Sequence, residues 1–286
     1  MRLVSFLSIL IVFLTSFQCS GKEPLIYWGI GHKRNPYITE LLTLVLNQAQ
    51  PNSYQVSPLT PDIPHFRAFQ ALEANNTIDI VIGYATEERL SKYRAIELPI
   101  MKGLNGWRVS IVRDNNIDLL KGVETTEQLS AFKPGLFHTW TDNQILLANK
   151  LTTVTGTDYE GLFKMLSKER FDYLPLTILD VEDEYAVRKD YPDLDIAIDP
   201  HVLIVYPVCF YFYVNKTNTE LATLIEDGFE AIIINGQFEA LFHRYFNSSI
   251  EKLAGPTRTI IQLENPLLPE SVPLNRDDLW MHQLLN

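Results

Sequence analysis

Short apolar runs alternate with amphipathic helical patterns along most of this 286-residue chain. Residues 24–30 and 78–83 are apolar and predict strands, whereas residues 37–49 carry apolar side chains at helical spacing and predict a helix with one buried face. Residues 202–214 are strongly apolar and rich in Tyr, and they predict two strands joined near Pro207. Strands that alternate with helices in this way are typical of an α/β fold.

Capping residues predict where several of these helices begin and end. Asn35 precedes Pro36, and Asp158 precedes an apolar helical pattern, so both are expected as N-caps. Thr86 and Thr141 are placed in the same way, and residues 235–236 (Asn-Gly) are expected to end a long helix.

The first residues resemble an export signal. Residues 3–17 are apolar and follow Arg2, and the run is shorter than the roughly 20 residues that a membrane span requires. We therefore expect a signal peptide over residues 1–20 and a periplasmic location, with an uncleaved anchor helix as the alternative. Lipid anchoring at Cys19 is a further alternative, which Ser16 and Gln18 at the flanking positions disfavour.

Composition limits the partners and the chemistry. The formal charge of −11 disfavours nucleic acid and anionic membrane surfaces as partners. Without the leader, Cys209 is the one remaining cysteine, so stability must come from the core, and the length favours two lobes. We find no nucleophile motif and no metal-ligand spacing, and the six His are scattered. We expect a monomer that is not an enzyme and holds no metal or cofactor.

Three segments stand out in this order along the chain: residues 78–89 (IDIVIGYATEER), 168–173 (KERFDY) and 235–246 (NGQFEALFHRYF). Together they resemble the extracellular solute-binding proteins of family 3. This family is the polar-amino-acid-binding type with the type II periplasmic-binding fold. The chain also resembles a divergent gammaproteobacterial branch, on residues 102–108 (KGLNGWR), 139–142 (TWTD) and 263–269 (LENPLLP).

The resemblance implies an α/β, two-lobed protein whose lobes are joined by a hinge of two crossing strands. Lobe 1 would comprise residues 22–105 and 208–286, lobe 2 would comprise residues 106–207, and the crossings would lie near Trp107 and Tyr206. It further implies capture of a small polar ligand, amino-acid-like or a small carboxylate, by hinge closure. The implied partner is the permease of an ABC transporter; a ligand-sensing module that signals to a separate membrane protein is the alternative.

Arg89 is the strongest candidate for a ligand contact. A guanidinium on a short helix after a strand can bind a carboxylate through two hydrogen bonds, which Lys cannot do. The resemblance implies the same role, because the matching Arg of the family binds the ligand's α-carboxylate. Thr86, on the same turn, joins the candidates. An exposed ion pair of Arg89 with Glu87 or Glu88 is the alternative.

Aromatic and polar candidates come from other parts of the chain. Residues 139–142 lie at a predicted helix N-terminus, where free N–H groups suit an anionic group, with capping alone as the alternative. Tyr84 ends a strand and can stack on a ligand. A carboxylate from Asp142 in the cleft would favour an amine instead. The candidates are Tyr37, Tyr84, Trp107, Thr139, Trp140 and Asp142. Ordinary packing is the alternative for Tyr84, Trp107 and Trp140, and a solvated loop is the alternative for Tyr37.

Three further segments bear on the ligand. Residues 32–34 (HKR) follow the first strand and could face the cleft, although we favour a solvated loop, and residues 180–184 (DVEDE) are interpreted as a solvated acidic face. The resemblance implies a charged residue shortly after residues 172–173, yet Leu176 and Thr177 occupy those positions and Asp180 comes later. This departure leaves the ligand's identity open.

Overall fold

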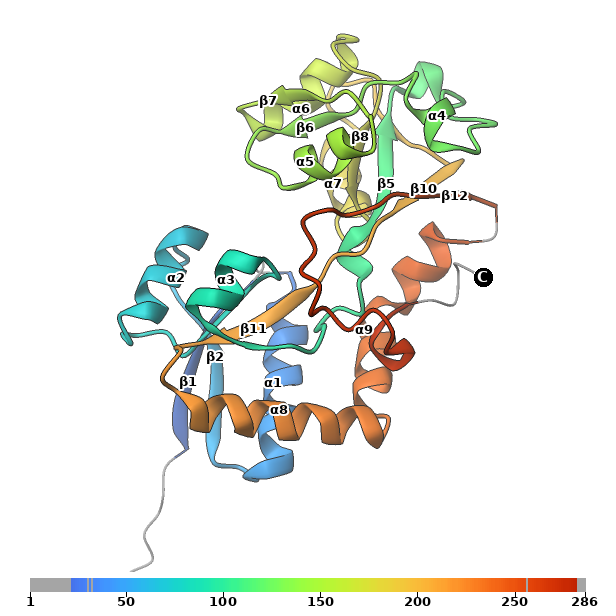
Figure 1. Ribbon diagram of the computed structural model, residues 1–286. Coiled ribbons are helices and arrows are strands. Elements are labelled where there is room, and N and C mark those ends of the chain that lie inside the picture. The colour runs from blue at the N-terminus through green and yellow to red at the C-terminus, as the bar shows by residue number, and fades with distance from the viewer. Residues whose placement is uncertain (1–21, 30, 32, 256, 282–286) are drawn as a thin grey trace, which may run out of the picture.

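The protein folds into two lobes joined by a connecting region (Figure 1). This computed structural model describes residues 22–29, 31, 33–255 and 257–281. The predicted leader and its Cys19 lie outside the described residues. Within the part of the chain that is described, no helix is both long and apolar enough to span a membrane.

The first lobe is built on a five-stranded sheet. Its strands, in order across the sheet, are β2 (Tyr54–Pro58), β1 (Glu23–Trp28), β3 (Ile80–Tyr84), β11 (Phe210–Val214) and β4 (Arg94–Ile96). The first three strands pair in parallel, and β11 runs antiparallel to β3 and β4. The helices of this lobe are α1 (Asn35–Ala49), α2 (His65–Glu73), α3 (Glu87–Lys92), α8 (Thr219–Ile234) and α9 (Gln237–Leu253).

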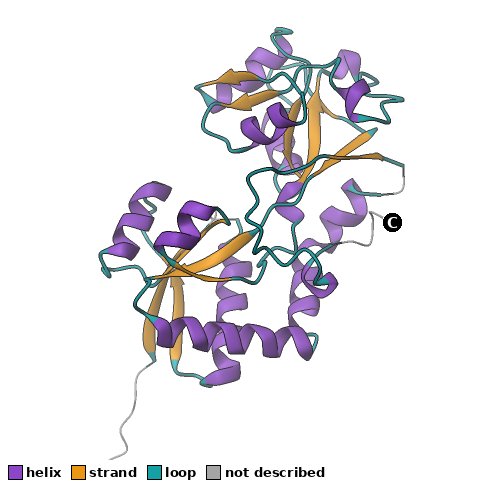
Figure 2. Cartoon of the chain, in the orientation of Figure 1, coloured by secondary structure: helices purple, strands orange, loops and turns teal. Residues whose placement is uncertain are grey.

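The second lobe contains a second sheet. Its strands are, in order, β12 (Thr259–Gln262), β10 (Val202–Val205), β5 (Trp107–Val112) and β8 (Leu174–Thr177), and β9 (Ala197–Ile198) also pairs with β5. A separate pair is formed by β6 (Gly135–Phe137) and β7 (Val154–Gly156). The surrounding helices are α4 (Thr126–Leu129), α5 (Asp142–Ala148), α6 (Tyr159–Ser167) and α7 (Val181–Arg188) (Figure 2).

Side-chain patterning explains the helices of the first lobe. The predicted stripe on α1 is buried, and this face packs against α8. Gly228 of α8 permits the close approach, because a Cβ there would lie 2.2 Å from the carbonyl oxygen of Val45. The predicted caps at Thr86 and Asp158 are confirmed, since each side chain accepts a hydrogen bond from a first-turn N–H. The predicted cap at Thr141 is wrong: it has helical dihedral angles and makes no capping hydrogen bond.

Two segments of the chain connect the lobes, one directly before β5 and one directly after β10. It enters the second lobe at Trp107 and returns through Tyr206 to β11, so the predicted crossing strands lie where the chain changes sheets. At this point the Tyr206 N–H donates to the carbonyl of Gly106. A Cβ on Gly106 would lie 1.9 Å from the Tyr206 carbonyl oxygen, so only Gly fits where the two crossing segments meet.

The C-terminal segment departs from the predicted division of the lobes. Residues 208–286 were expected in lobe 1, but β12 pairs in parallel with β10 in the second sheet. The segment then returns along the hinge. There Asn265 Nδ2 donates to the Pro207 carbonyl at 2.8 Å, and the Met281 N–H donates to the Lys102 carbonyl. Residues 259–262 are β-prone, which explains the strand, and pairing with β10 makes it an edge strand of the second sheet.

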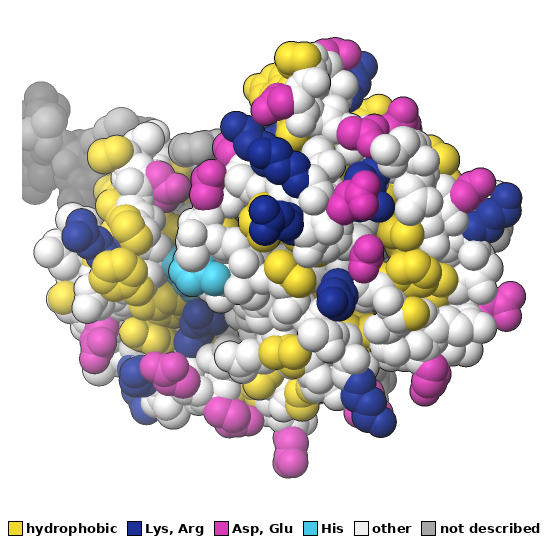
Figure 3. Space-filling view, turned by 90° about the horizontal axis from the view of Figure 1, so that it is seen from above, with side chains coloured by type: hydrophobic (Ala, Val, Ile, Leu, Met, Phe, Trp, Pro, Cys, Tyr) yellow, Lys and Arg dark blue, Asp and Glu magenta, His cyan; other side chains and the backbone are white. Residues whose placement is uncertain are grey.

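The outer face of the second lobe carries charged side chains of both signs. Figure 3 shows Lys and Arg interspersed with Asp and Glu across this face, with hydrophobic side chains in small groups between them. The surface charge is therefore mixed on this side, although the chain as a whole is acidic.

Candidate ligand-binding site

A cavity of about 240 Å³ lies between the two lobes. The first lobe contributes the end of β3, the start of β11 and the loop before α1; the second contributes the starts of α5, α6 and α7 and the end of β8. The hinge contributes β5 and the turn before it. The residues that line the cavity are Arg34, Tyr84, Asn105, Arg108, Trp140, Asp142, Tyr159, Leu176, Thr177, Asp180 and Phe210.

A buried ion pair forms the hinge side of the cavity. Arg108 Nη2 lies 2.5 Å from Asp142 Oδ1, and both side chains are more than nine-tenths buried. Arg108 Nε also donates to the Tyr206 hydroxyl at 2.7 Å, and that hydroxyl donates to Asp142. Burial opposes the charge on Arg108, but the neighbouring Asp142 and Tyr206 outweigh it and raise the pKa of the guanidinium above its ordinary value.

Aromatic rings form walls in both lobes. In the first lobe the rings of Tyr84 and Phe210 lie 4.2 Å apart, and in the second the rings of Trp140 and Tyr159 lie 6.0 Å apart. Burial raises the pKa of the Tyr84 hydroxyl, as does nearby Asp142. The hydroxyl therefore stays protonated at neutral pH and can donate a hydrogen bond, while the rings offer apolar faces.

A second ion pair closes the cavity across the cleft. Arg34 Nη2, from the first lobe, lies 2.6 Å from Asp180 Oδ2, at the start of α7 in the second lobe. Further ion pairs join the lobes outside the cavity lining: Lys33 Nζ lies 2.7 Å from Asp183 Oδ2, and Lys252 of α9 pairs with Glu182.

These contacts correct two interpretations of the sequence. Lys33 and Arg34 form ion pairs with the other lobe instead of belonging to a solvated loop, and His32 lies outside the described residues. Residues 180–184 provide their partners instead of forming a free acidic face. Acidic side chains at the start of α7 are also favoured by the helix dipole.

Asn105 brings a buried polar atom to the cavity. The residue lies in the turn before β5 and is only 6% exposed. Its Oδ1 has no hydrogen-bond partner among the described residues. A buried amide oxygen without a partner costs about 1–3 kcal/mol, so a donor on a ligand or a water molecule would be favoured at this position.

The predicted site residues divide into two groups. Tyr84, Trp140 and Asp142 line the cavity, although the carboxylate of Asp142 is held by Arg108. Thr86 and Thr139 do not line it: the first caps α3 and the second is exposed.

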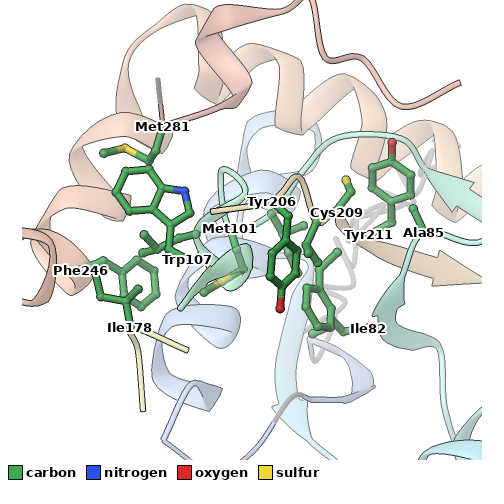
Figure 4. Packing of buried hydrophobic residues seen from close by; sticks show 14 of the residues in the cluster. Ile82, Ala85, Met101, Trp107, Ile178, Tyr206, Cys209, Tyr211, Phe246 and Met281 are labelled. Carbon is green, nitrogen blue, oxygen red and sulfur yellow. The ribbon is translucent and has the colours of Figure 1, made fainter. Parts of the chain in front are cut away.

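Two further candidates are packed in the core instead of lining the cavity. The hydroxyl of buried Tyr37 donates to the Ile100 carbonyl at 2.6 Å, and its ring contacts Phe246. Trp107 is 3% exposed and lies among Phe246, Ile178 and Met281 in the hinge core (Figure 4).

Arg89 also lies outside the cavity lining. Its Nη1 donates to the Tyr84 carbonyl at 2.9 Å, and its guanidinium lies 5.1 Å from the centre of the Phe69 ring. Burial lowers the pKa of this group. Arg89 thus packs beneath a residue of the cavity wall, and its direct contact with a ligand stays a prediction.

Several lining residues were not predicted from the sequence. Arg108 sits inside an apolar strand, and neither its direction nor its pairing with Asp142, 34 positions away, has a local signal. Leu176 and Thr177, at the positions where the resemblance implied a charged residue, line the cavity. The charged lining residue of this segment is Asp180. Tyr159 and Phe210 have ordinary packing positions in the sequence, and no motif singles them out. Asn105 lies in residues 102–108, which carry the branch resemblance, but nothing in that resemblance assigned it a ligand contact.

The described residues hold no group of three or more His, Cys, Asp or Glu placed to bind a metal ion. Cys209, which directly precedes β11, is 1% exposed, and burial raises the pKa of its thiol. The lining itself offers paired charges, hydroxyls, an amide and aromatic faces.

No protein-family model and no curated protein matches the chain, but many solved structures do. A Bacillus subtilis protein, designated a probable amino-acid ABC transporter extracellular-binding protein, aligns with a TM-score of 0.58 at 16% identity, covering 78% of this chain and 97% of that one. The chain has the two-lobed type II periplasmic-binding fold. The expected resemblance in fold is confirmed, and membership of the narrower branch stays a prediction.

Two other solved structures that are similar to this chain have different described roles. An ancestral amino acid-binding protein, a precursor of cyclohexadienyl dehydratase, has a TM-score of 0.51 at 16% identity and covers 79% of this chain and 96% of its own. The periplasmic domain of BvgS from B. pertussis has a TM-score of 0.52 at 13% identity and covers 79% of this chain and 43% of its own. At such identities the likeness establishes the fold alone.

Proposed function

We propose that this chain is an exported solute-binding protein that captures a small polar ligand between its lobes and delivers it to an ABC-type permease. The observation that carries the proposal is the cavity whose wall is shared by both lobes and the hinge. Its volume of about 240 Å³ lies near the lower end of the range for small-molecule sites, about 300–1,000 Å³, which suits an amino acid or a molecule of similar size.

Capture would work by hinge closure. The backbone contact between Gly106 and Tyr206 joins the two crossing segments, and Trp140 and Tyr159 lie across the cavity from Tyr84 and Phe210. A ligand that touches both walls stabilises the closed arrangement by the difference between its affinities for the closed and open states. Closure also excludes water, so each polar contact inside becomes stronger.

Sensing is the second candidate, because one of the similar structures is the BvgS periplasmic domain. The same cavity and closure would then be read by a separate membrane protein instead of a permease. Catalysis is a weaker proposal: it would need a nucleophile and base, or carboxylates with separated pKa values, and both cavity carboxylates are held by Arg.

A thermal-shift screen followed by calorimetry tests the proposal. The purified chain, without its leader, is screened against the proteinogenic amino acids, small carboxylates, amides and short peptides. Leu176→Trp fills the cavity, and Leu147→Trp makes the same change at an exposed site on α5 that does not line it.

We expect a ligand that raises the Tm of the wild type and of Leu147→Trp but not of Leu176→Trp. The unliganded Tm of each variant shows whether it has folded. A ligand that stabilises Leu176→Trp equally would bind elsewhere, and a broad screen without any ligand would contradict a solute-binding role.

A further inference from the structure

The charges in the cavity wall occur as two internal ion pairs. Arg108 pairs with Asp142 at 2.5 Å, and Arg34 pairs with Asp180 at 2.6 Å. Among the described residues that line the cavity, these are all the Lys, Arg, Asp and Glu side chains. The two cations therefore balance the two carboxylates.

The charges behind this wall also sum to zero. Behind Tyr159, Arg188 pairs with both Glu184, at 2.6 Å, and Glu160, at 2.5 Å, so this group carries one excess negative charge, and the Glu160 side chain is 58% exposed. Beneath Tyr84, Arg89 supplies one positive charge. The formal charges of these four groups therefore cancel.

Closure completes the balance for one of the two pairs. Arg34 comes from the first lobe and Asp180 from the second, whereas Arg108 on β5 and Asp142 on α5 both belong to the second lobe. The Arg34 side chain is 15% exposed in this arrangement, and that of Asp180 is 34% exposed. A ligand is thus enclosed by a wall whose charges are already neutralised by one another.

Burying a net charge in such a wall is unfavourable. An enclosed ion loses its hydration, and the loss is repaid only when an unpaired opposite charge faces it. A net anion would have to draw Arg34 or Arg108 from its carboxylate and leave that carboxylate without compensation. A zwitterion or an uncharged polar molecule needs no such exchange, because opposite ends of it can face opposite members of the two pairs.

We propose that the cavity selects ligands of zero net charge, zwitterionic or uncharged, and excludes net anions and net cations of the same size. This selectivity rests on the proposed solute-binding function and narrows it, since it disfavours small carboxylates as ligands. It also makes Asp180 and Arg34 the residues that set the ligand's charge, because each can be neutralised without breaking the buried Arg108–Asp142 pair.

Matched probes test the selectivity. Calorimetry compares L-glutamine with L-glutamate and L-lysine, L-asparagine with L-aspartate, and glutaramide with glutarate, so that size is nearly constant while net charge changes. Asp180→Asn gives the wall one net positive charge, and Arg34→Gln gives it one net negative charge. Asp183→Asn and Lys33→Gln make the same changes in the neighbouring interlobe pair, outside the lining.

In the wild type we expect the neutral member of the best-binding pair to bind at least about tenfold more tightly than its charged partners. Asp180→Asn should move the ratio toward the anion by about tenfold, and Arg34→Gln should move it toward the cation. The two control variants should keep the wild-type ratio, even if they change all affinities together.

Tighter wild-type binding of an anion or a cation than of its neutral match would overturn the proposed selectivity while leaving the solute-binding function in place. An unchanged ratio in both Asp180→Asn and Arg34→Gln would overturn the role of these two residues. Absence of binding by every probe, and by the wider screen, would overturn the solute-binding function and the selectivity with it.

Discussion

The ion pairs that join the lobes outside the cavity should hold the unliganded protein partly closed. Lys33 and Lys252 reach from the first lobe to Asp183 and Glu182 at the start of α7. Replacing both lysines by glutamate removes two attractions and places like charges opposite each other. Neither lysine lines the cavity, so the double variant perturbs closure without altering the ligand-binding wall.

The size of the effect follows from exposure. Lys33 and Asp183 are 61% and 54% exposed, and Lys252 and Glu182 are 67% and 32% exposed, so each pair is worth about 0.2–1 kcal/mol. Reversal replaces attraction by repulsion and roughly doubles the contribution of each pair, which gives about 0.8–4 kcal/mol for the double variant. The ratio of closed to open molecules should therefore fall by about fourfold to several hundredfold, because each 1.4 kcal/mol is about tenfold.

Fluorescence energy transfer between single labels on each lobe measures this ratio. Gln70→Cys on α2 and Gln144→Cys on α5 are exposed positions on helices that face each other across the gap between the lobes (Figure 1). Cys209 is 1% exposed and stays unlabelled, and Cys19 is replaced by Ser. The double variant should shift toward low transfer, and 1 M salt should shift the wild type the same way, because the Debye length falls to about 3 Å.

Lys92→Glu is the matched control, since Lys92 pairs with Glu88 within α3 and makes no interlobe contact. It should leave the transfer distribution unchanged. Equal distributions for the wild type, the double variant and the high-salt wild type would refute the reasoning that these pairs favour closure.

Three further predictions concern single side chains. Trp140→Ala should raise the ligand's Kd about five- to tenfold in calorimetry by removing one aromatic wall, with little change in unliganded Tm because Trp140 is only half-buried. Tyr37→Phe should lower the free energy of unfolding in urea by about 1–2 kcal/mol, through loss of the buried bond to Ile100, and leave Kd unchanged; a weaker Kd would instead support its predicted ligand contact. Burial, with nearby Arg89, lowers the pKa of His65 from 6.5 to about 4. Between pH 6.5 and pH 4 the unfolded chain therefore binds a proton that the folded chain does not, so the free energy of unfolding falls as the pH falls. His65→Gln should remove about 2–3 kcal/mol of this acid sensitivity in urea titrations at pH 7 and pH 4.5; an unchanged pH profile would contradict the shifted pKa.

Local patterns were sufficient to predict much of the fold. The helical spacing of apolar residues identified α1 and its buried face, and Asn235-Gly236 marked the end of α8. Residues 202–214 were expected as two strands, and β10 and β11 indeed lie on either side of Pro207, in different sheets. These features depend on neighbours within a few residues, which a sequence displays directly.

The remaining features depend on partners that are distant along the chain. The short apolar strand β12 has no local signal that says which sheet it joins. Arg34 and Asp180 are 146 positions apart, so neither residue's sequence context indicates that they meet across the cleft. Trp107 was equally compatible with core and cleft, and Tyr37 was expected in the cleft or in a solvated loop, yet packing against Phe246 places both in the core.

A crystal structure of the protein with its tightest-binding ligand tests the central claim most directly. The account predicts that the ligand lies in the interlobe cavity, in contact with the Trp140–Tyr159 wall and with Tyr84 or Phe210 on the opposite side, while the Arg108–Asp142 pair stays intact. A ligand found elsewhere, or bound to one lobe with the cavity empty, would contradict capture by closure.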